Sequence, residues 1–290
     1  MANNSNIEWC EATWNPLAGC SIVSTECKNC YAMKMAKRLA AMGQKKYEGT
    51  THDVNGHTVW TGKINVDYGV IDAPLDRKKP TTYFVNSMSD WCHEDVPQAA
   101  WTAIMGTMLT AHWHTFQCLT KRPERQRDLV NAYINQLHPG DKKPIRNIWL
   151  GTSVGIKASV SRIKALQETN AHIRFISFEP LLEDVGQLDL SGIQWAILGG
   201  ESGAGARPCD VQWIRNIVSQ CRHAGVKVFV KQLGRYPGFS TRNMSGSEAG
   251  QSYHHYDDKS KLFIKAMGDG KGGILSEFPP DLKLREYPAP

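Results

Sequence analysis

The chain has 290 residues, of which 41% are hydrophobic, and it carries a formal net charge of +6. This length allows a sizeable buried core in one or two domains, and the mildly basic charge permits a nucleic-acid partner without requiring one. No apolar run approaches the roughly 18 residues that suggest a membrane span. Residues 1–8 are polar and lack the apolar centre of a secretory signal. We therefore expect a cytosolic protein, without a membrane partner, whose thiols stay reduced.

The first predicted helix covers residues 31–42 and follows a loop that is rich in cysteine. Residues 44–80 contain many Gly, Asp, Asn, Lys and Pro residues, which predicts an inserted loop or hairpin. From residue 82 onward, apolar runs alternate with segments of helical periodicity. Strands are predicted at 82–86, 115–119, 147–151, 173–178, 194–199 and 226–230. Helices are predicted between them at 96–111, 123–137, 157–168 and 211–224.

The predicted strands are almost continuously apolar, as expected where helices cover both faces of a sheet. Strand–helix alternation favours right-handed βαβ units and a parallel sheet. We therefore predict an α/β protein, a partial (β/α) barrel, with a doubly wound open sheet as the alternative. The barrel domain is expected at 1–234, with the insertion at 44–80. Residues 235–290 are rich in Gly, Ser and Pro and are expected to form an irregular extension packed on the barrel.

Polar and small residues follow the predicted strands. In a (β/α) barrel these strand ends meet at one rim, where the chemistry takes place. A Ser or Asp at a single strand end is usually a helix cap, but six such ends on one rim indicate a site. The candidate residues are Asn86, Ser87, Ser89, Asp90, Lys121, Arg122, Ser153, Glu179, Glu201, Lys231 and Gln232.

Three of the eight cysteines form the pattern C-x6-C-x2-C, with Cys20, Cys27 and Cys30 just before the helix predicted at 31–42. Eight cysteines in a reducing compartment are not a disulfide framework. Three thiolates on one loop can hold a [4Fe–4S] cluster and leave one iron open. A structural zinc site needs four ligands, and the nearby Cys10, His52 and His57 do not stand at the spacing of a zinc finger.

The cysteine pattern resembles the motif of the radical S-adenosylmethionine superfamily, with a first gap of six residues in place of the usual three. The longer gap is similar to that of a three-cysteine-motif branch encoded by phages and prophages. The resemblance extends over nearly the whole chain. The matching segments are 7–9, 13–16, 19–20, 27–32, 84–90, 119–123, 178–182, 199–203, 206–208 and 231–234.

The resemblance implies a barrel of the radical S-adenosylmethionine type, with a [4Fe–4S] cluster on the three cysteines. It also implies that S-adenosylmethionine binds the open iron and is cleaved to a 5′-deoxyadenosyl radical. In that superfamily the end of the second barrel strand usually holds the methionyl group of this cofactor. In this chain the role is expected of Asn86, Ser87, Ser89 or Asp90. The residues assigned to the cofactor are Asn86, Ser87, Ser89, Asp90, Ser153 and Glu201.

Some phage members of this branch resemble enzymes of thymidine hypermodification. The implied activity is an isomerase that converts glycyl-thymidine linked through nitrogen into the form linked through the glycine α-carbon. Lys121, Glu179 and Lys231 are assigned catalytic roles. Arg122, Arg207 and Gln232 are assigned to the substrate, whose carboxylate and phosphates suit Arg and Lys. For each cation the alternative is a surface or interstrand ion pair.

The expected partners are DNA that carries the modified thymidine and an electron donor such as flavodoxin or ferredoxin. A thymidine in duplex DNA would have to be flipped out to reach the rim, and His254, His255, Lys259 and Lys261 of the extension are expected to follow its phosphates. The expected location is the cytoplasm, or the host cytoplasm for a phage protein. Two alternatives are a radical S-adenosylmethionine enzyme acting on tRNA, a free nucleotide or a peptide, and a zinc-stabilised nucleic-acid-binding module.

Overall fold

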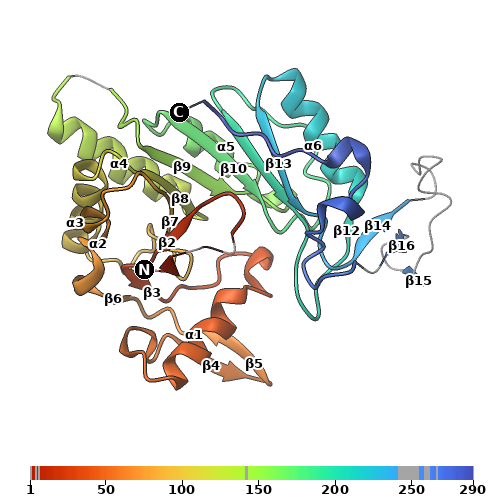
Figure 1. Ribbon diagram of the computed structural model, residues 1–290, viewed down its shortest axis with the longest axis horizontal. Coiled ribbons are helices and arrows are strands. Elements are labelled where there is room, and N and C mark those ends of the chain that lie inside the picture. The colour runs from red at the N-terminus through yellow and green to blue at the C-terminus, as the bar shows by residue number, and fades with distance from the viewer. Residues whose placement is uncertain are drawn as a thin grey trace. The chain divides into compact units, whose positions relative to one another are not determined.

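The computed structural model describes residues 2, 3, 5, 7–140, 143–240, 255–257, 262–265 and 267–289. The chain divides into two compact units (Figure 1). Unit 1 contains residues 1–152 and 164–174, and unit 2 contains residues 153–163 and 175–289. Within the described ranges, no helix has both the length and the apolar character that a membrane crossing requires.

Unit 1 is built on a parallel sheet. Its strands are β1 (Ala2–Asn3), β2 (Ala12–Trp14), β7 (Thr82–Val85), β8 (Thr115–Thr120) and β9 (Ile148–Ser153). Strands β2, β7, β8 and β9 pair in parallel in that order, and β1 pairs antiparallel with β2. Helices α3 (Gln98–Thr110) and α4 (Pro123–Leu137) connect the strands. All six residues of β9 are buried, which explains the apolar run Ile148-Trp149-Leu150 at its start.

Strand β2 was not predicted from the sequence. It has three residues, too few for a periodic pattern, and residues 15 and 16 directly after it are Asn and Pro. The parallel neighbour β7 supplies its hydrogen bonds, and the Trp14 side chain is fully buried with Nε1 donating to the Val70 carbonyl. Because β2 is the first parallel strand, β7 is the second, and Asn86 to Asp90 follow its carboxyl end.

The sequence predicted an inserted loop or a hairpin at 44–80, and the segment contains a hairpin. Its elements are η2 (Lys45–Tyr47), β4 (Thr51–Val54), β5 (His57–Trp60), β6 (Asn65–Val66), η3 (Tyr68–Val70) and α2 (Ala73–Asp76). Strand β6 pairs antiparallel with β3 (Leu17–Ala18), so the insertion holds the start of the cysteine loop. Helix α1 (Tyr31–Ala41) buries Ala32, Met33 and Ala36 in an apolar cluster that also includes Tyr47 and Trp60.

Unit 2 continues the alternation with β10 (Ile173–Phe178), β11 (Trp195–Gly199) and β13 (Lys227–Gln232), which pair in parallel. Helix α6 (Val211–His223) precedes β13 and is capped by the Asp210 carboxylate, which accepts from the Gln212 amide. The helix predicted at 157–168 is instead split into η4 (Lys157–Ser159) and α5 (Arg162–Gln167). Ser159 explains the break, because its side chain accepts from the amides of Gly155 and Ile156.

The hydrogen-bonded strands follow the order β1-β2-β7-β8-β9-β10-β11-β13. From β2 onward this is the order along the chain. A doubly wound sheet reverses its strand order at a switch point, and no reversal is present among the described strands. The chain is therefore a mixed α/β protein with seven parallel strands, consistent with a partial (β/α) barrel.

The C-terminal segment is more regular than the sequence predicted. A second sheet has the order β12-β14-β16-β15, formed by β12 (Cys209–Asp210), β14 (Pro237–Phe239), β15 (His255–Asp257) and β16 (Leu262–Ile264). Two short helices follow, η5 (Leu275–Glu277) and η6 (Pro280–Leu282). These strands have two or three residues each, which is too short for a sequence pattern to reveal. The expected boundary at residue 234 stays a prediction.

Candidate functional site

The three cysteines of the motif lie on one loop between β3 and α1. Cys20 comes two residues after β3, Cys27 ends the short helix η1 (Thr25–Cys27), and Cys30 is the N-cap residue of α1. The Cys30 amide donates to the Cys27 carbonyl, and the Met33 amide donates to the Cys30 carbonyl. The loop therefore presents its second and third thiols from a tight turn that leads directly into a helix.

The start of this loop is fastened to the end of β7. The Gly19 amide donates to the Met88 carbonyl, and the Ser89 hydroxyl donates to the Gly19 carbonyl at 2.6 Å. Gly19 has a φ of +97°, and a Cβ there would lie 2.0 Å from the Lys63 carbonyl oxygen, so only glycine fits. These contacts place Cys20 beside the polar residues at the carboxyl end of the second parallel strand, where the sequence predicted a site.

The three thiols influence one another. Burial is the main cause that raises the pKa of Cys20 to about 12, and the Asp90 charge and the other two thiols add to it. Burial also raises the pKa of Cys30, while the Lys121 charge acts in the opposite direction. Among the described residues, however, no group of three or more His, Cys, Asp or Glu is arranged to hold a metal ion. Neutral thiols have no mutual attraction, and the free energy that gathers such ligands comes from the metal itself.

The three thiols of the loop have the ligand chemistry of an iron–sulfur cluster, although the described residues are not gathered around a metal. Cys20 and Cys30 pack against the apolar cluster of Ala18, Ala32, Met33 and Met88, which shields one side of the loop from water. Burial raises the pKa of both thiols, and the positive charges of Arg122 and Lys121 oppose this increase at Cys20 and Cys30 respectively, so they would favour bound thiolates. A soft, thiolate-only set of three ligands matches a cluster with one open iron.

A buried ionic network lies next to Cys20, and the sequence pattern did not reveal it as a unit. The Arg122 guanidinium donates from Nε to both Glu94 oxygens at 2.8 Å, from Nη1 to Asp90 at 3.0 Å, and from Nη2 to Ser21 at 2.6 Å. His93 Nε2 lies 2.9 Å from the same Ser21 hydroxyl. The sequence did not predict Ser21, His93 or Glu94. Their contacts with one another and with Arg122 join residues that are distant in the sequence.

Asp90, predicted as a cofactor residue, accepts four hydrogen bonds within the protein. Oδ1 accepts from the Cys92 amide and the Thr120 hydroxyl, and Oδ2 accepts from the Lys121 amide and Arg122. The structure thus gives Asp90 a clear role in joining the ends of β7 and β8. Arg122, predicted as a substrate residue, makes the interstrand ion pair that was weighed as its alternative. The cofactor and substrate roles of both residues stay predictions.

The other predicted residues after β7 face the loop in different ways. Asn86 has a φ of +58°, and its Oδ1 accepts from the Leu17 amide while its buried Nδ2 has no partner among the described residues. The Ser87 hydroxyl donates to Asn15 Oδ1 at 3.1 Å, and the Ser87 carbonyl accepts from the Tyr31 hydroxyl. Asn15 therefore connects the end of β2 to the end of β7. Asn86 and Ser87 remain candidates for the methionyl group.

Unit 2 brings together a second group of predicted residues. Glu179 Oε1 lies 3.1 Å from Lys231 Nζ, and the Ser177 hydroxyl lies 3.4 Å from Glu179 Oε2. A Cβ on Gly199 would lie 2.6 Å from Glu179 Oε1, so the glycine leaves space for this carboxylate. Gln232 Nε2 donates to the Gly200 carbonyl at 2.7 Å. Strands β10, β11 and β13 thus present a charge pair at their carboxyl ends.

Glu201 and Arg207 form a separate pair in the same unit. Glu201 is buried, and its Oε2 accepts from the Arg207 amide and from Nε, each at 2.9 Å, while Oε1 accepts from Nη2. Ser153, at the end of β9, is buried, and its carbonyl accepts from Arg162 Nη1. Of the residues expected to follow DNA phosphates, His255 is the first residue of β15, while His254, Lys259 and Lys261 lie outside the described residues.

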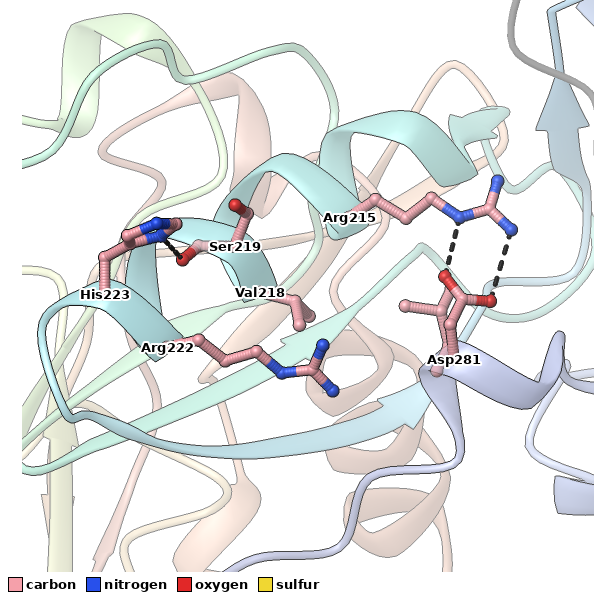
Figure 2. Close-up of a pocket in the computed structure, with 7 residues that line it drawn as sticks. Arg215, Val218, Ser219, Arg222, His223 and Asp281 are labelled. Atoms are coloured by element: carbon pink, nitrogen blue, oxygen red, sulfur yellow. Dashed lines mark hydrogen bonds and ion pairs between the residues drawn. The ribbon is translucent and has the colours of Figure 1, made fainter.

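An open pocket of about 330 Å³ in unit 2 is shown in Figure 2. It is lined by α6 and the start of η6. Arg215 forms two hydrogen bonds with the Asp281 carboxylate on one side, and the Arg222 and His223 side chains project from the end of the helix. The pocket includes none of the residues predicted to bind cofactor or substrate, so it does not define the candidate site.

A family model described as "Protein of unknown function (DUF5131)" matches residues 4–260 of the chain. This range includes the cysteine loop, the ionic network beside it and both charge pairs of unit 2. No curated protein and no solved structure matches the chain.

Proposed function

We propose that this chain, which belongs to the DUF5131 family of proteins of unknown function, is a radical S-adenosylmethionine enzyme that modifies thymidine in phage DNA. The observation that carries the proposal is the loop with Cys20, Cys27 and Cys30, fastened through Gly19 to the end of the second parallel strand. That arrangement brings three soft ligands next to a strand end with polar residues, where a (β/α) barrel performs chemistry.

In this proposal Cys20, Cys27 and Cys30 hold the cluster, and Asn86, Ser87 and Ser89 bind the methionyl group of S-adenosylmethionine. When bound, the cluster supplies the electron that cleaves S-adenosylmethionine and starts radical chemistry. Asn86 supports this assignment, because its buried Nδ2 has a hydrogen-bond donor to spare within the described residues. The apolar cluster under the loop excludes water from the cysteines.

Lys231 and Glu179 offer the substrate one positive and one negative group 3.1 Å apart. A glycine attached through its nitrogen has a carboxylate and an amine, which match Lys231 and Glu179 respectively. Isomerisation requires the glycyl group to be held while its α-hydrogen is removed, the thymidylmethyl group migrates from nitrogen to the α-carbon, and a hydrogen is returned to the nitrogen. The pair orients the glycyl group for this step, with Arg207 and Gln232 assigned to the rest of the nucleotide.

The proposal is tested on protein purified without oxygen. We expect a brown protein with about four irons, the number that the cube requires, which yields 5′-deoxyadenosine from S-adenosylmethionine after reduction by dithionite. Cys20→Ala, Cys27→Ala and Cys30→Ala should each lose the cluster. Cys10→Ala is the matched control, because Cys10 is also in unit 1 and its thiol donates to the Ser5 hydroxyl and the Ile7 carbonyl of the N-terminal segment. A colourless protein with one zinc would overturn the proposal and favour the zinc module.

The substrate is tested separately, with DNA that contains glycyl-thymidine linked through nitrogen. Isomerisation leaves the mass of the nucleoside unchanged and moves its chromatographic retention, so digestion followed by liquid chromatography and mass spectrometry detects it. Lys231→Met should abolish this conversion while the iron content stays at the wild-type level. If the wild-type protein forms 5′-deoxyadenosine but leaves this DNA unchanged, the radical class stands and tRNA, a free nucleotide or a peptide becomes the substrate class to test.

A further inference from the structure

Ser21 directly follows the first cysteine of the motif, and its hydroxyl oxygen accepts two hydrogen bonds. Arg122 Nη2 donates to it at 2.6 Å. His93 Nε2 lies at 2.9 Å, and the Asp95 amide donates to His93 Nδ1 at 3.1 Å. Because Nδ1 accepts, the ring hydrogen of the neutral imidazole is on Nε2, so His93 is the second donor to Ser21.

The hydrogen of the Ser21 hydroxyl is therefore not used in either of these two hydrogen bonds. A hydroxyl has one hydrogen and two acceptor lone pairs, and Arg122 and His93 occupy both lone pairs. No acceptor for the hydrogen is present among the described residues. The two donors cannot easily turn away, because Arg122 is also bound to Glu94 and Asp90 and its side chain is only 6% exposed.

Ser21 directly follows the first ligand in the chain. The Cys20 thiol donates to the Ser21 backbone carbonyl at 3.5 Å. The charges of Asp90 and Arg122, which belong to the same network, both act on the Cys20 thiol. The network thus holds the side chain of Ser21, the residue after Cys20, so that its hydroxyl hydrogen is directed at neither Arg122 nor His93.

We propose that the Ser21 hydroxyl donates a hydrogen bond to a sulfur of the cluster, and that Arg122 and His93 orient it for this purpose. The inference rests on the proposed function. Hydrogen bonds to the sulfurs are among the properties that set the reduction potential of an iron–sulfur cluster. A donor stabilises the more negative, reduced state, so Ser21 raises the potential and eases reduction of the cluster. Ser21 is a positioning residue for the cluster and takes no part in the reaction itself.

The test is a redox titration of the cluster, followed by electron paramagnetic resonance of its reduced form. Ser21→Val is compared with Ser21→Thr, because the two side chains have the same shape and only Thr retains the hydroxyl. We expect Ser21→Val to lower the ratio of reduced to oxidised cluster at a fixed potential about tenfold, which is about 59 mV for one electron. Ser21→Thr should restore the wild-type potential.

Thr110→Val is the control, at a hydroxyl in helix α3 of the same unit. The Thr110 hydroxyl donates to the Gly106 carbonyl at 2.9 Å, so its hydrogen is already used. Its removal should leave the potential at the wild-type value. Ser21→Ala serves as a second variant without the hydroxyl, should Val not fit the loop.

The outcomes separate this inference from the proposed function. If the wild-type protein holds no cluster, the proposed function fails. If it holds the cluster but the intact clusters of Ser21→Val and Ser21→Ala have the wild-type potential, the inference about Ser21 is wrong. A variant that loses iron while its remaining clusters keep the wild-type potential would also overturn it, because Ser21 would then only shape the loop.

Discussion

Buried charge holds the loops of unit 1 together at the scale of single residues. Asp90 and Arg122 are almost completely buried, and their carboxylate and guanidinium groups connect four segments: the cysteine loop, the end of β7, the loop with Glu94 and the end of β8. The salt bridge between Lys37 and Asp53 is half exposed on both sides. The two pairs therefore offer a comparison between a buried charge pair and an exposed one.

Asp90→Asn should destabilise the protein by about 3 kcal/mol, because it leaves the buried Arg122 charge without one of its partners. The new amide group would also present hydrogens to donors that now bind a carboxylate. Asp53→Asn, the control, should cost much less, since exposed pairs are screened by water. Urea unfolding of the two variants measures both values. Equal losses would mean that Asp90 does not connect the loops as described.

At the scale of elements, the last residues of the chain complete the sheet of unit 2. The Glu286 amide donates to the Val228 carbonyl, and the Val230 amide donates to the Leu284 carbonyl. Trp195 Nε1 donates to the Glu286 carbonyl, and the Arg285 guanidinium lies 4.5 Å from the centre of the Phe229 ring. The segment covers backbone groups of β13 that an edge strand would leave open.

Deletion of residues 284–290 should therefore destabilise unit 2 by at least about 2 kcal/mol, from the lost hydrogen bonds alone. Hydrogen exchange at Val228 and Val230 should become faster, since the contacts across the strand are gone. Deletion of residues 288–290 is the control, because it leaves the bonds of Leu284 and Glu286 in place. Unchanged protection of β13 in the longer deletion would show that this segment does not cover the strand in solution.

At the scale of the whole molecule, buried histidines make stability depend on pH. His114 is 1% exposed, and its Nε2 lies 3.0 Å from the Pro74 carbonyl. Burial lowers its pKa below the usual 6.5, and the Arg77 charge acts in the same direction, while the hydrogen bonds to backbone carbonyls and the Glu11 charge oppose the shift. Because the unfolded chain binds the proton more readily, stability is full above pH 6.5 and falls as the pH drops from 6.5 towards the lower pKa of the folded state.

His114→Gln should remove this part of the pH dependence, because Gln can donate to the Pro74 carbonyl without titrating. Urea unfolding at several pH values between 7.5 and 5 measures the effect. Below pH 6.5 the loss of stability in the variant should be less steep, by up to about 1.4 kcal/mol per pH unit. His93 has a lowered pKa in both proteins and does not affect the comparison. Identical slopes would contradict the assignment to His114.

The sequence by itself determined the alternation of strands and helices from residue 82 onward. Helix α4 begins and ends where it was predicted, and the predicted strands at 82–86, 115–119 and 173–178 correspond to β7, β8 and β10. These elements are long enough for apolar periodicity to identify them. The sequence also predicted that polar residues gather at strand ends, because parallel strands all present their carboxyl ends on the same side.

Only the tertiary structure decided which of these residues bond to one another. Strand β2, the small sheet of β12, β14, β15 and β16, and the pairing of the chain end with β13 are made of segments with at most six residues. Their stability comes from neighbours that are distant in the chain. The same holds for Ser21, which bonds to Arg122 across 101 positions of sequence. No local pattern records such a contact, because the free energy that holds it comes from the folded surroundings.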